Sequence, residues 1–281
     1  GLGGLLYGID LGIIAGALPY LEATSGFTSN QLSVVVAAVL LGSVGSTLFA
    51  GLLSDAWGRR PVIIVSGFAF ILSVPMMALS SSFFTLVLGR LFQGISAGLV
   101  GVVVPLYLAE CLGATNRGKG TGVFQWLITL GIFTAALVAW LFSFRVEAIE
   151  QLQDAQRLFD FKNLAWRSIF WISLIPGLAF TVGSFFTSES PRWLFRQGRR
   201  AEAKAVLMKT RPEAQAESEL QEMEALQGAP SKVEAQRESI FRRKYMIPFA
   251  LACAILMGTQ ATGINSIIGY NTTLLIQSGL S

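Results

Sequence analysis

Long runs of apolar residues dominate the chain, and short polar segments separate them. A helix needs about 20 apolar residues to cross a bilayer. Seven stretches fit, at roughly residues 1–21, 31–53, 61–80, 83–110, 121–143, 168–187 and 245–277. The pattern therefore predicts an all-α membrane protein.

Residues 188–244 form the only sizeable polar segment between these stretches. Apolar residues recur at helical spacing within 199–210 and 212–227, where Ala203 and Leu207 share one face and Leu220 and Met223 another. Two short amphipathic helices are expected there. They form either a solvated linker between two bundles or a latch that packs under both.

Composition supports a membrane protein and argues against several other classes. Of the 281 residues, 53% are hydrophobic and only 14% are charged, whereas soluble domains have about 25% charged residues. The net charge of +4 fits basic loops on one membrane face better than nucleic-acid binding. The chain has no histidine, no nucleophile–base spacing and no phosphate loop. No enzymatic activity, cofactor or metal site is therefore expected.

Basic residues give the expected orientation. They gather in the loops after spans two and four and in the segment after span six, which all fall on one side if every stretch crosses. The positive-inside rule places that side, and the N-terminus, in the cytoplasm. The loop after span five is an exception, because its four basic residues are balanced by four acidic ones.

Two charges interrupt the apolar spans. Asp10 lies in the first span and Arg90 in the fourth. Ionisable residues within membrane helices usually face the bundle interior, pair with one another and mark an ion or substrate path. An acid and a base on different spans point to a transporter that takes up and releases a proton. The alternative is a permanent structural ion pair.

Further charges lie where the spans end on the cytoplasmic side. The loop Gly51–Arg60 contains Asp55, Arg59 and Arg60, and the end of span four carries Glu110 and, in the following loop, Arg117. These groups are expected either to pair and close the inner side or to snorkel to the interface. Glu189 and Arg192, at the end of span six, are further candidate gate charges.

Together these motifs resemble the sugar porter family of the major facilitator superfamily, which includes glucose facilitators and bacterial xylose–proton symporters. The resemblance covers nearly the whole chain in the same order. It rests on Gly8–Gly16, Gly51–Arg60, Arg90, Pro105–Glu110, Arg117-Gly118, Gln125, Ser188–Leu194 and Gln260–Asn265.

The resemblance implies a fold of twelve spans in two six-helix bundles that are joined by a cytoplasmic helical domain. On this basis, residues 1–187 are expected to form the N-terminal bundle and residues 188–244 the linker domain. Residues 245–281 would contribute the first helix of the second bundle. A functional monomer in the bacterial inner membrane is expected for the complete transporter.

The resemblance also implies the mechanism, which is alternating access. An acid at the position of Asp10 carries the proton in similar symporters. Arg90 is expected to change the proton affinity of this acid, because burial favours the neutral carboxyl group and a nearby guanidinium favours the charged one. Gln125, Gln260 and Asn265 match sugar-binding positions, and each amide can donate and accept hydrogen bonds. For any single amide, a contact between helices is an equal alternative.

The leading hypothesis is therefore a proton-coupled monosaccharide symporter. A uniporter with the same fold differs only in the role of Asp10, and a transporter-like sugar sensor is a further alternative. Thr259 and Gly269 depart from the family pattern in span seven. They leave a hexose, a pentose and a cyclic polyol all open as the substrate.

Overall fold

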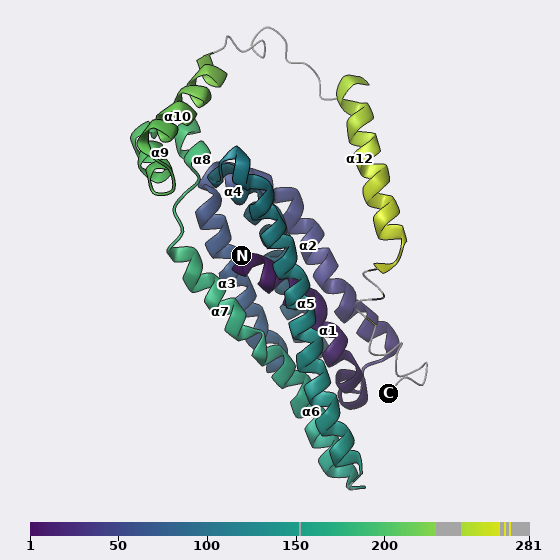
Figure 1. Cartoon of the computed structure of the whole chain (residues 1–281). Coiled ribbons are helices and arrows are strands. Elements are labelled where there is room, and N and C mark those ends of the chain that lie inside the picture. The colour runs from purple at the N-terminus through teal and green to yellow at the C-terminus, as the bar shows by residue number, and fades with distance from the viewer. Residues whose placement is uncertain (152, 229–242, 265–266, 268–269, 271–281) are drawn as a thin grey trace.

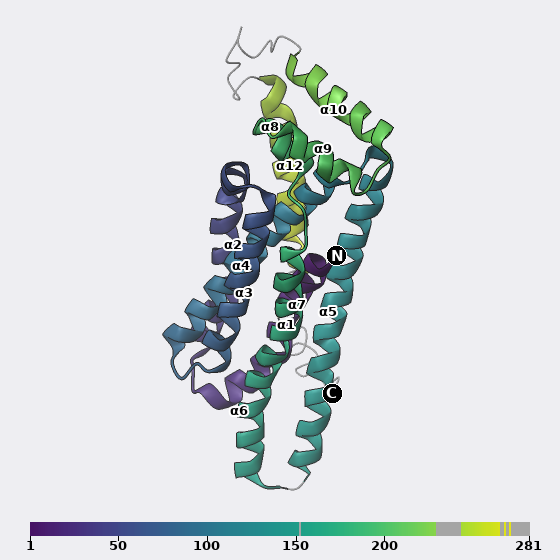
Figure 2. The ribbon, with the colours of Figure 1, turned by 90° about the vertical axis from the view of Figure 1, so that its left-hand side faces the viewer.

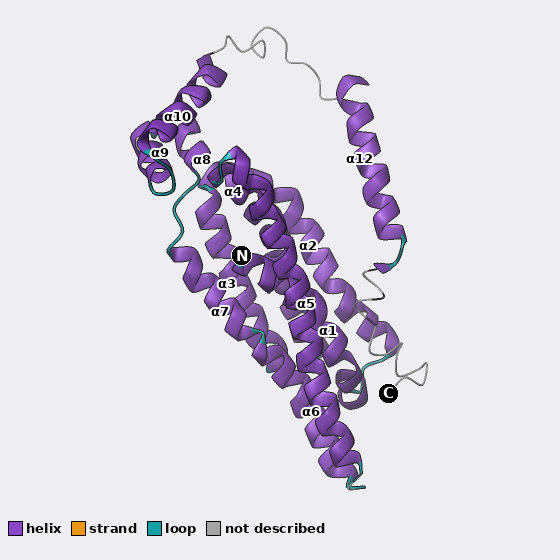
Figure 3. Ribbon diagram, in the orientation of Figure 1, coloured by secondary structure: helices purple, strands orange, loops and turns teal. Residues whose placement is uncertain are grey.

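The computed structural model describes residues 1–151, 153–228, 243–264, 267 and 270. The described residues are almost entirely helical and contain no strand (Figures 1 and 3). The helices are α1 Leu2–Ser25, α2 Ser29–Trp57, α3 Arg59–Ala78, α4 Phe83–Cys111, α5 Ala114–Glu150, α6 Ala155–Ile172, α7 Leu174–Phe185, α8 Pro191–Arg196, α9 Arg200–Met208, α10 Glu213–Gly228 and α12 Arg243–Ala261.

Six stretches in this set are long and apolar enough to cross a membrane. They correspond to α1 to α5 and to α6 and α7 taken together, which form one stretch, Ala155–Phe185, with a break at Ser173. The first six predicted spans are therefore confirmed as apolar helices. The seventh, 245–277, is described only in part, through α12.

The segment after α5 differs from the prediction. The sequence pattern indicated a loop across 144–167, but the structure continues α5 to Glu150 and starts α6 at Ala155. The two helices run together beyond the ends of the other bundle helices (Figure 2). The segment has no Pro or Gly to end a helix, and the Asp154 side chain caps α6 by accepting from the backbone N–H of Arg157. Its charges are typical of a helix that leaves the bilayer, as well as of a loop.

Short turns fix where the other spans end. Thr28 caps α2 in a capping box with Gln31, which satisfies two backbone donors at once. Gly58 separates α2 from α3 with a φ of 100°, a conformation open to glycine and costly for other residues. This single-residue turn brings the end of α2 and the start of α3 to one end of the bundle.

Small residues allow the helices to pack closely. Gly8 of α1 lies against the backbone carbonyl of Ile128 in α5, and a Cβ at this position would collide with it. Gly94 of α4 approaches the carbonyl of Val39 in α2 in the same way. Glycine at these two positions therefore allows each pair of helices to touch backbone to backbone. Such close approach is how membrane helices gain van der Waals contact.

Helices α8, α9 and α10 lie at one end of the bundle, called the linker end below (Figures 1 and 2). They share a small core of their own that includes Trp193, Ala203, Leu207 and Leu220. The apolar faces predicted for the two amphipathic helices are therefore confirmed. Contacts between α8 and α4 join this unit to the bundle.

Candidate functional site

The first candidate region is the interface between α1 and α4, where both intramembrane charges are buried. Asp10 is 3% exposed and Arg90 is 2% exposed. Their helices contact each other, so the bundle interior holds an acid and a base, as the sequence predicts. Two charges in this setting are costly unless they are paired or hydrated.

The two charges do not form an ion pair in the structure. Both carboxylate oxygens of Asp10 are buried without a hydrogen bond. The guanidinium of Arg90 is held elsewhere, because its Nη1 donates to Oε1 of Gln93, one turn along α4, at 2.5 Å. The structure therefore brings Asp10 and Arg90 into one buried region and leaves a gap between them.

The second region is a set of charges at the linker end, with Arg59 at its centre. Arg59 is the first residue of α3 and is 2% exposed. Its Nε and Nη2 donate to the two carboxylate oxygens of Glu110 at 2.8 and 2.9 Å. Its Nη1 donates to the carbonyl of Ser54 at 2.8 Å and lies 2.9 Å from Oδ1 of Asp55. Such two-point arginine–carboxylate pairing is strong and directional.

Glu110 joins this pair to α8. One of its oxygens accepts from the hydroxyl of Ser190, and the other lies 3.3 Å from Nη2 of Arg196. Ser190 is also the N-cap of α8, where its hydroxyl accepts from the backbone N–H of Trp193. One carboxylate thus connects the ends of α3, α4 and α8.

The side chain of Glu189 belongs to the same set of contacts and binds backbone N–H groups. Its carboxylate accepts from the N–H groups of Arg59, at 2.9 Å, and Arg60, at 3.2 Å. These are the first N–H groups of α3, at the positive end of its helix dipole, where an anion is favourable. Asp55, Arg59, Glu110, Glu189, Ser190 and Arg196 are called the Arg59 network below.

The remaining charges of the predicted gate are not in this network. The Arg60 side chain donates to the carbonyl of Phe185, and the Nε of the half-buried Arg117 is without a hydrogen bond. Arg192 is exposed. It lines a cavity of about 400 Å³ together with Glu110, Phe195, Arg196, Glu219, Glu222 and Met223.

Two of the three predicted sugar-binding amides are described by the structure, and they lie on different helices. Gln125 is exposed on α5, and Gln260 is exposed near the end of α12. Asn265 lies outside the described residues.

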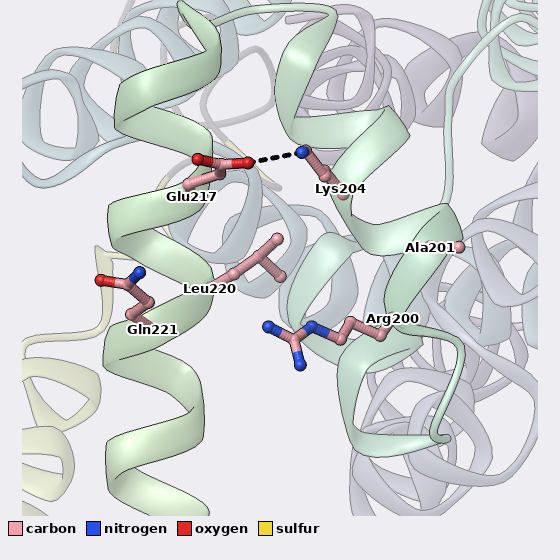
Figure 4. Close-up of a pocket in the computed structure, with 6 residues that line it drawn as sticks. All are labelled: Arg200, Ala201, Lys204, Glu217, Leu220 and Gln221. Atoms are coloured by element: carbon pink, nitrogen blue, oxygen red, sulfur yellow. Dashed lines mark hydrogen bonds and ion pairs between the residues drawn. The ribbon is translucent and has the colours of Figure 1, made fainter.

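A second cavity, of about 590 Å³, lies between α9 and α10 (Figure 4). Lys204 of α9 reaches Glu217 of α10 at 2.6 Å, and this contact holds the pKa of Glu217 below its ordinary value. Arg200 pairs with Glu224 in the same region. These charges are paired with each other across α9 and α10. We therefore interpret the cavity as part of the packing between the two linker helices and not as a binding site.

Several contributors were missed by the sequence analysis. Ser190 stands directly before Pro191 in a helix-start pattern, and that signal was available. Gln93 was visible as an amide within an apolar span, three residues from Arg90. For Arg196, an exposed basic residue in a basic segment, no local signal pointed to Glu110.

The chain matches a known protein family over its whole length. The profile of the family described as "Sugar (and other) transporter" matches residues 1–281. The chain is 32% identical over 280 residues to the probable metabolite transport protein CsbC of Bacillus subtilis, covering 99% of this chain and 56% of CsbC. It is 31% identical to the galactose-proton symporter of Escherichia coli K12, covering 96% of this chain and 54% of the symporter.

The fold has a counterpart among solved structures. The partially occluded inward-open conformation of the xylose transporter XylE from E. coli matches with a TM-score of 0.77 and 24% identity. The match covers 96% of this chain and 63% of XylE. This chain thus spans about half the length of the curated relatives it matches. All of these proteins are named as transporters, in agreement with the expectation that the chain is not an enzyme.

Proposed function

Because the chain belongs to the sugar transporter family, we propose that it forms part of a proton-coupled monosaccharide symporter that works by alternating access. The observation that carries the proposal is the Asp10 carboxylate, which is 3% exposed in the bundle interior with both oxygens unpaired. A carboxyl group in this position can change its charge by binding a proton without first breaking a hydrogen bond. The similarity to a galactose-proton symporter supports the same reading.

The coupling follows from electrostatics. The cost of a charged Asp10 depends on how near the Arg90 guanidinium lies, because opposite charges interact strongly in a medium of low dielectric constant. A rocking motion that changes the distance between α1 and α4 therefore changes the affinity for the proton. Proton binding and the direction in which the cavity opens are linked in this way.

The sugar is a hexose, a pentose or a cyclic polyol, and Gln125, Gln260 and Asn265 are its proposed hydrogen-bonding partners. The exposure of Gln125 supports this role, because its amide is accessible to a ligand. Each sugar hydroxyl donates and accepts, which suits amide side chains.

The Arg59 network is the proposed gate on the cytoplasmic side of this half of the transporter. In this arrangement, residues 1–187 form the N-terminal bundle, 188–244 the linker domain and 245–281 the start of a second bundle. The N-terminus faces the cytoplasm of a bacterial cell, according to the distribution of basic residues. Four network contacts around Glu110 support a closed state of this end.

The test is uptake of labelled sugar into proteoliposomes that contain the full-length gene product, with and without an inward proton gradient. Wild-type protein should accumulate sugar above equilibrium only when the gradient is present. Asp10→Asn should lose accumulation and retain exchange of labelled for unlabelled sugar. Asp160→Asn, which changes an exposed carboxylate on α6, is the matched control and should behave as wild type.

Equilibration of sugar at the same rate with or without the gradient would identify a facilitator and make Asp10 structural. Gradient-driven accumulation by Asp10→Asn would also exclude Asp10 as the proton carrier.

A further inference from the structure

The side chain of Gln93 lies in the polar region between α1 and α4 and has one end unsatisfied. Gln93 is completely buried. Its Oε1 accepts from Arg90, while its Nε2 is buried without an acceptor. Buried amide groups are normally hydrogen-bonded at both ends, so the free NH₂ group indicates a partner that is a water molecule or an acceptor nearby.

The register of α1 against α4 places Gln93 between the two charges. A Cβ at Gly3 would lie 3.2 Å from Val104, and a Cβ at Gly101 would lie 3.4 Å from Tyr7. These two contacts make the helices antiparallel, with residue numbers at one level adding to 107 or 108. Asp10 is therefore level with residues 97–98 of α4.

Arg90 is seven to eight residues from that level, which is about 11 Å along the helix axis at 1.5 Å per residue. Gln93 lies one turn from Arg90 in the direction of Asp10. Gln93 shares the side of α4 that faces α1, because Val104, which lies against Gly3 of α1, is three turns from Gln93 along the same row.

The unpaired groups are chemically complementary. Asp10 offers two oxygens without donors, and Gln93 offers an NH₂ group without an acceptor. We infer that Gln93 is a positioning residue of the proton site: its carbonyl oxygen holds the Arg90 guanidinium away from Asp10, and its NH₂ group faces the Asp10 carboxyl across one bound water.

No other charged group competes for Asp10 within the part of the chain that the structure describes. Tyr7, one turn earlier on α1, is the further ionisable side chain that interacts electrostatically with Asp10. The stretch of α5 against α1, from Phe124 to Ala139, and the whole of α7 carry no ionisable residue. Arg167 of α6 is bonded to the Ala78 carbonyl, and Asp55 of α2 is bonded in the Arg59 network.

The consequence concerns pH. Without the amide of Gln93, the Arg90 guanidinium loses its acceptor and turns to the carboxylate of Asp10. A direct guanidinium partner makes a carboxylate harder to protonate by about one to three pH units. This inference rests on the proposed symport.

The experiment uses the full-length gene product in proteoliposomes and measures sugar accumulation against external pH, together with sugar exchange. Gln93→Met replaces the amide by an apolar side chain of the same length that fits irregular spaces, and Gln93→Leu is a second apolar variant in case the first does not fold. In both variants, the pH at which accumulation is half-maximal should fall by about one unit or more. The rate of sugar exchange should stay within twofold of wild type. Ser96→Ala, which removes another buried and unbonded hydroxyl of α4, is the control and should leave the midpoint unchanged.

The outcomes separate the two proposals. If wild-type protein shows no gradient-driven accumulation, the proposed symport fails. If wild type is coupled and the Gln93 variants keep its midpoint or move it to higher pH, the role of Gln93 is overturned. Parallel loss of accumulation and exchange would likewise overturn it and make Gln93 a packing residue.

Discussion

Removing the carboxylate of Glu110 is expected to destabilise the bundle strongly. In Glu110→Ala, Arg59 stays 2% exposed but loses both of its charge-assisted hydrogen bonds to that carboxylate. Breaking a buried ion pair from one side costs about 3–5 kcal/mol, because the remaining charge is left uncompensated. Arg59 keeps Asp55 at 2.9 Å, so the expected loss is about 3 kcal/mol, near the lower limit.

Equilibrium unfolding in detergent micelles measures this loss as a change in the free energy of unfolding. The matched control is Glu224→Ala, which removes the partner of Arg200 in an exposed ion pair on the linker helices. Exposed pairs contribute about 0–1 kcal/mol. The two variants should therefore differ by about 2 kcal/mol or more.

A double-mutant cycle makes the test sharper. In Arg59→Ala/Glu110→Ala neither charge is left alone, so the double variant should be less destabilised than the sum of the single variants. A Glu110→Ala protein within about 1 kcal/mol of the Glu224→Ala control would refute the argument. It would mean that water reaches Arg59 as soon as its partner is removed.

Other contacts give further predictions. Gln125→Ala should weaken sugar binding at least threefold in an unchanged fold, measured by equilibrium binding; an unaltered binding constant would return Gln125 to a structural role. Ser190→Ala removes the cap that accepts from Trp193 and should cost about 0.5–2 kcal/mol in unfolding, and no change would show that the linker end is held by its charges alone. Gly8→Val places side-chain atoms against the carbonyl of Ile128 and should abolish folded expression, as judged by size-exclusion chromatography; a monodisperse, active variant would contradict the close packing of α1 and α5.

The positions of the helices could be predicted from the sequence where apolar runs end at residues with a structural signal. Thr28 and Gly58 bound α2, and the observed helix extends the predicted stretch 31–53 by only a few residues at each end. The continuation of α5 and α6 across 144–167 could not be predicted from hydropathy. Polar residues mark the edge of the bilayer but do not show whether the helix continues beyond it.

For the candidate site, the sequence could likewise predict which residues are buried or paired, but not how the helices are aligned along their axes. Arg59 and Glu110 lie at span ends on one side, so pairing was one of the two expected arrangements, beside snorkelling to the interface, and the structure pairs them. The burial of Asp10 and Arg90 was expected from their spans. Their separation was not, because periodicity gives the face on which a residue lies but not the axial register between two helices. That register depends on contacts such as Tyr7 with Gly101.

The Arg59 network also sets an order of events during synthesis. Glu110 follows Arg59 by 51 residues and Glu189 follows it by 130. At about 5–20 residues per second, Arg59 is therefore added to the chain roughly 6–26 s before the last of these carboxylates. Until then the first backbone N–H groups of α3 have no side-chain acceptor from Glu189. Translation of the segment that starts α8, rather than of α3 or α4, completes this end of the bundle.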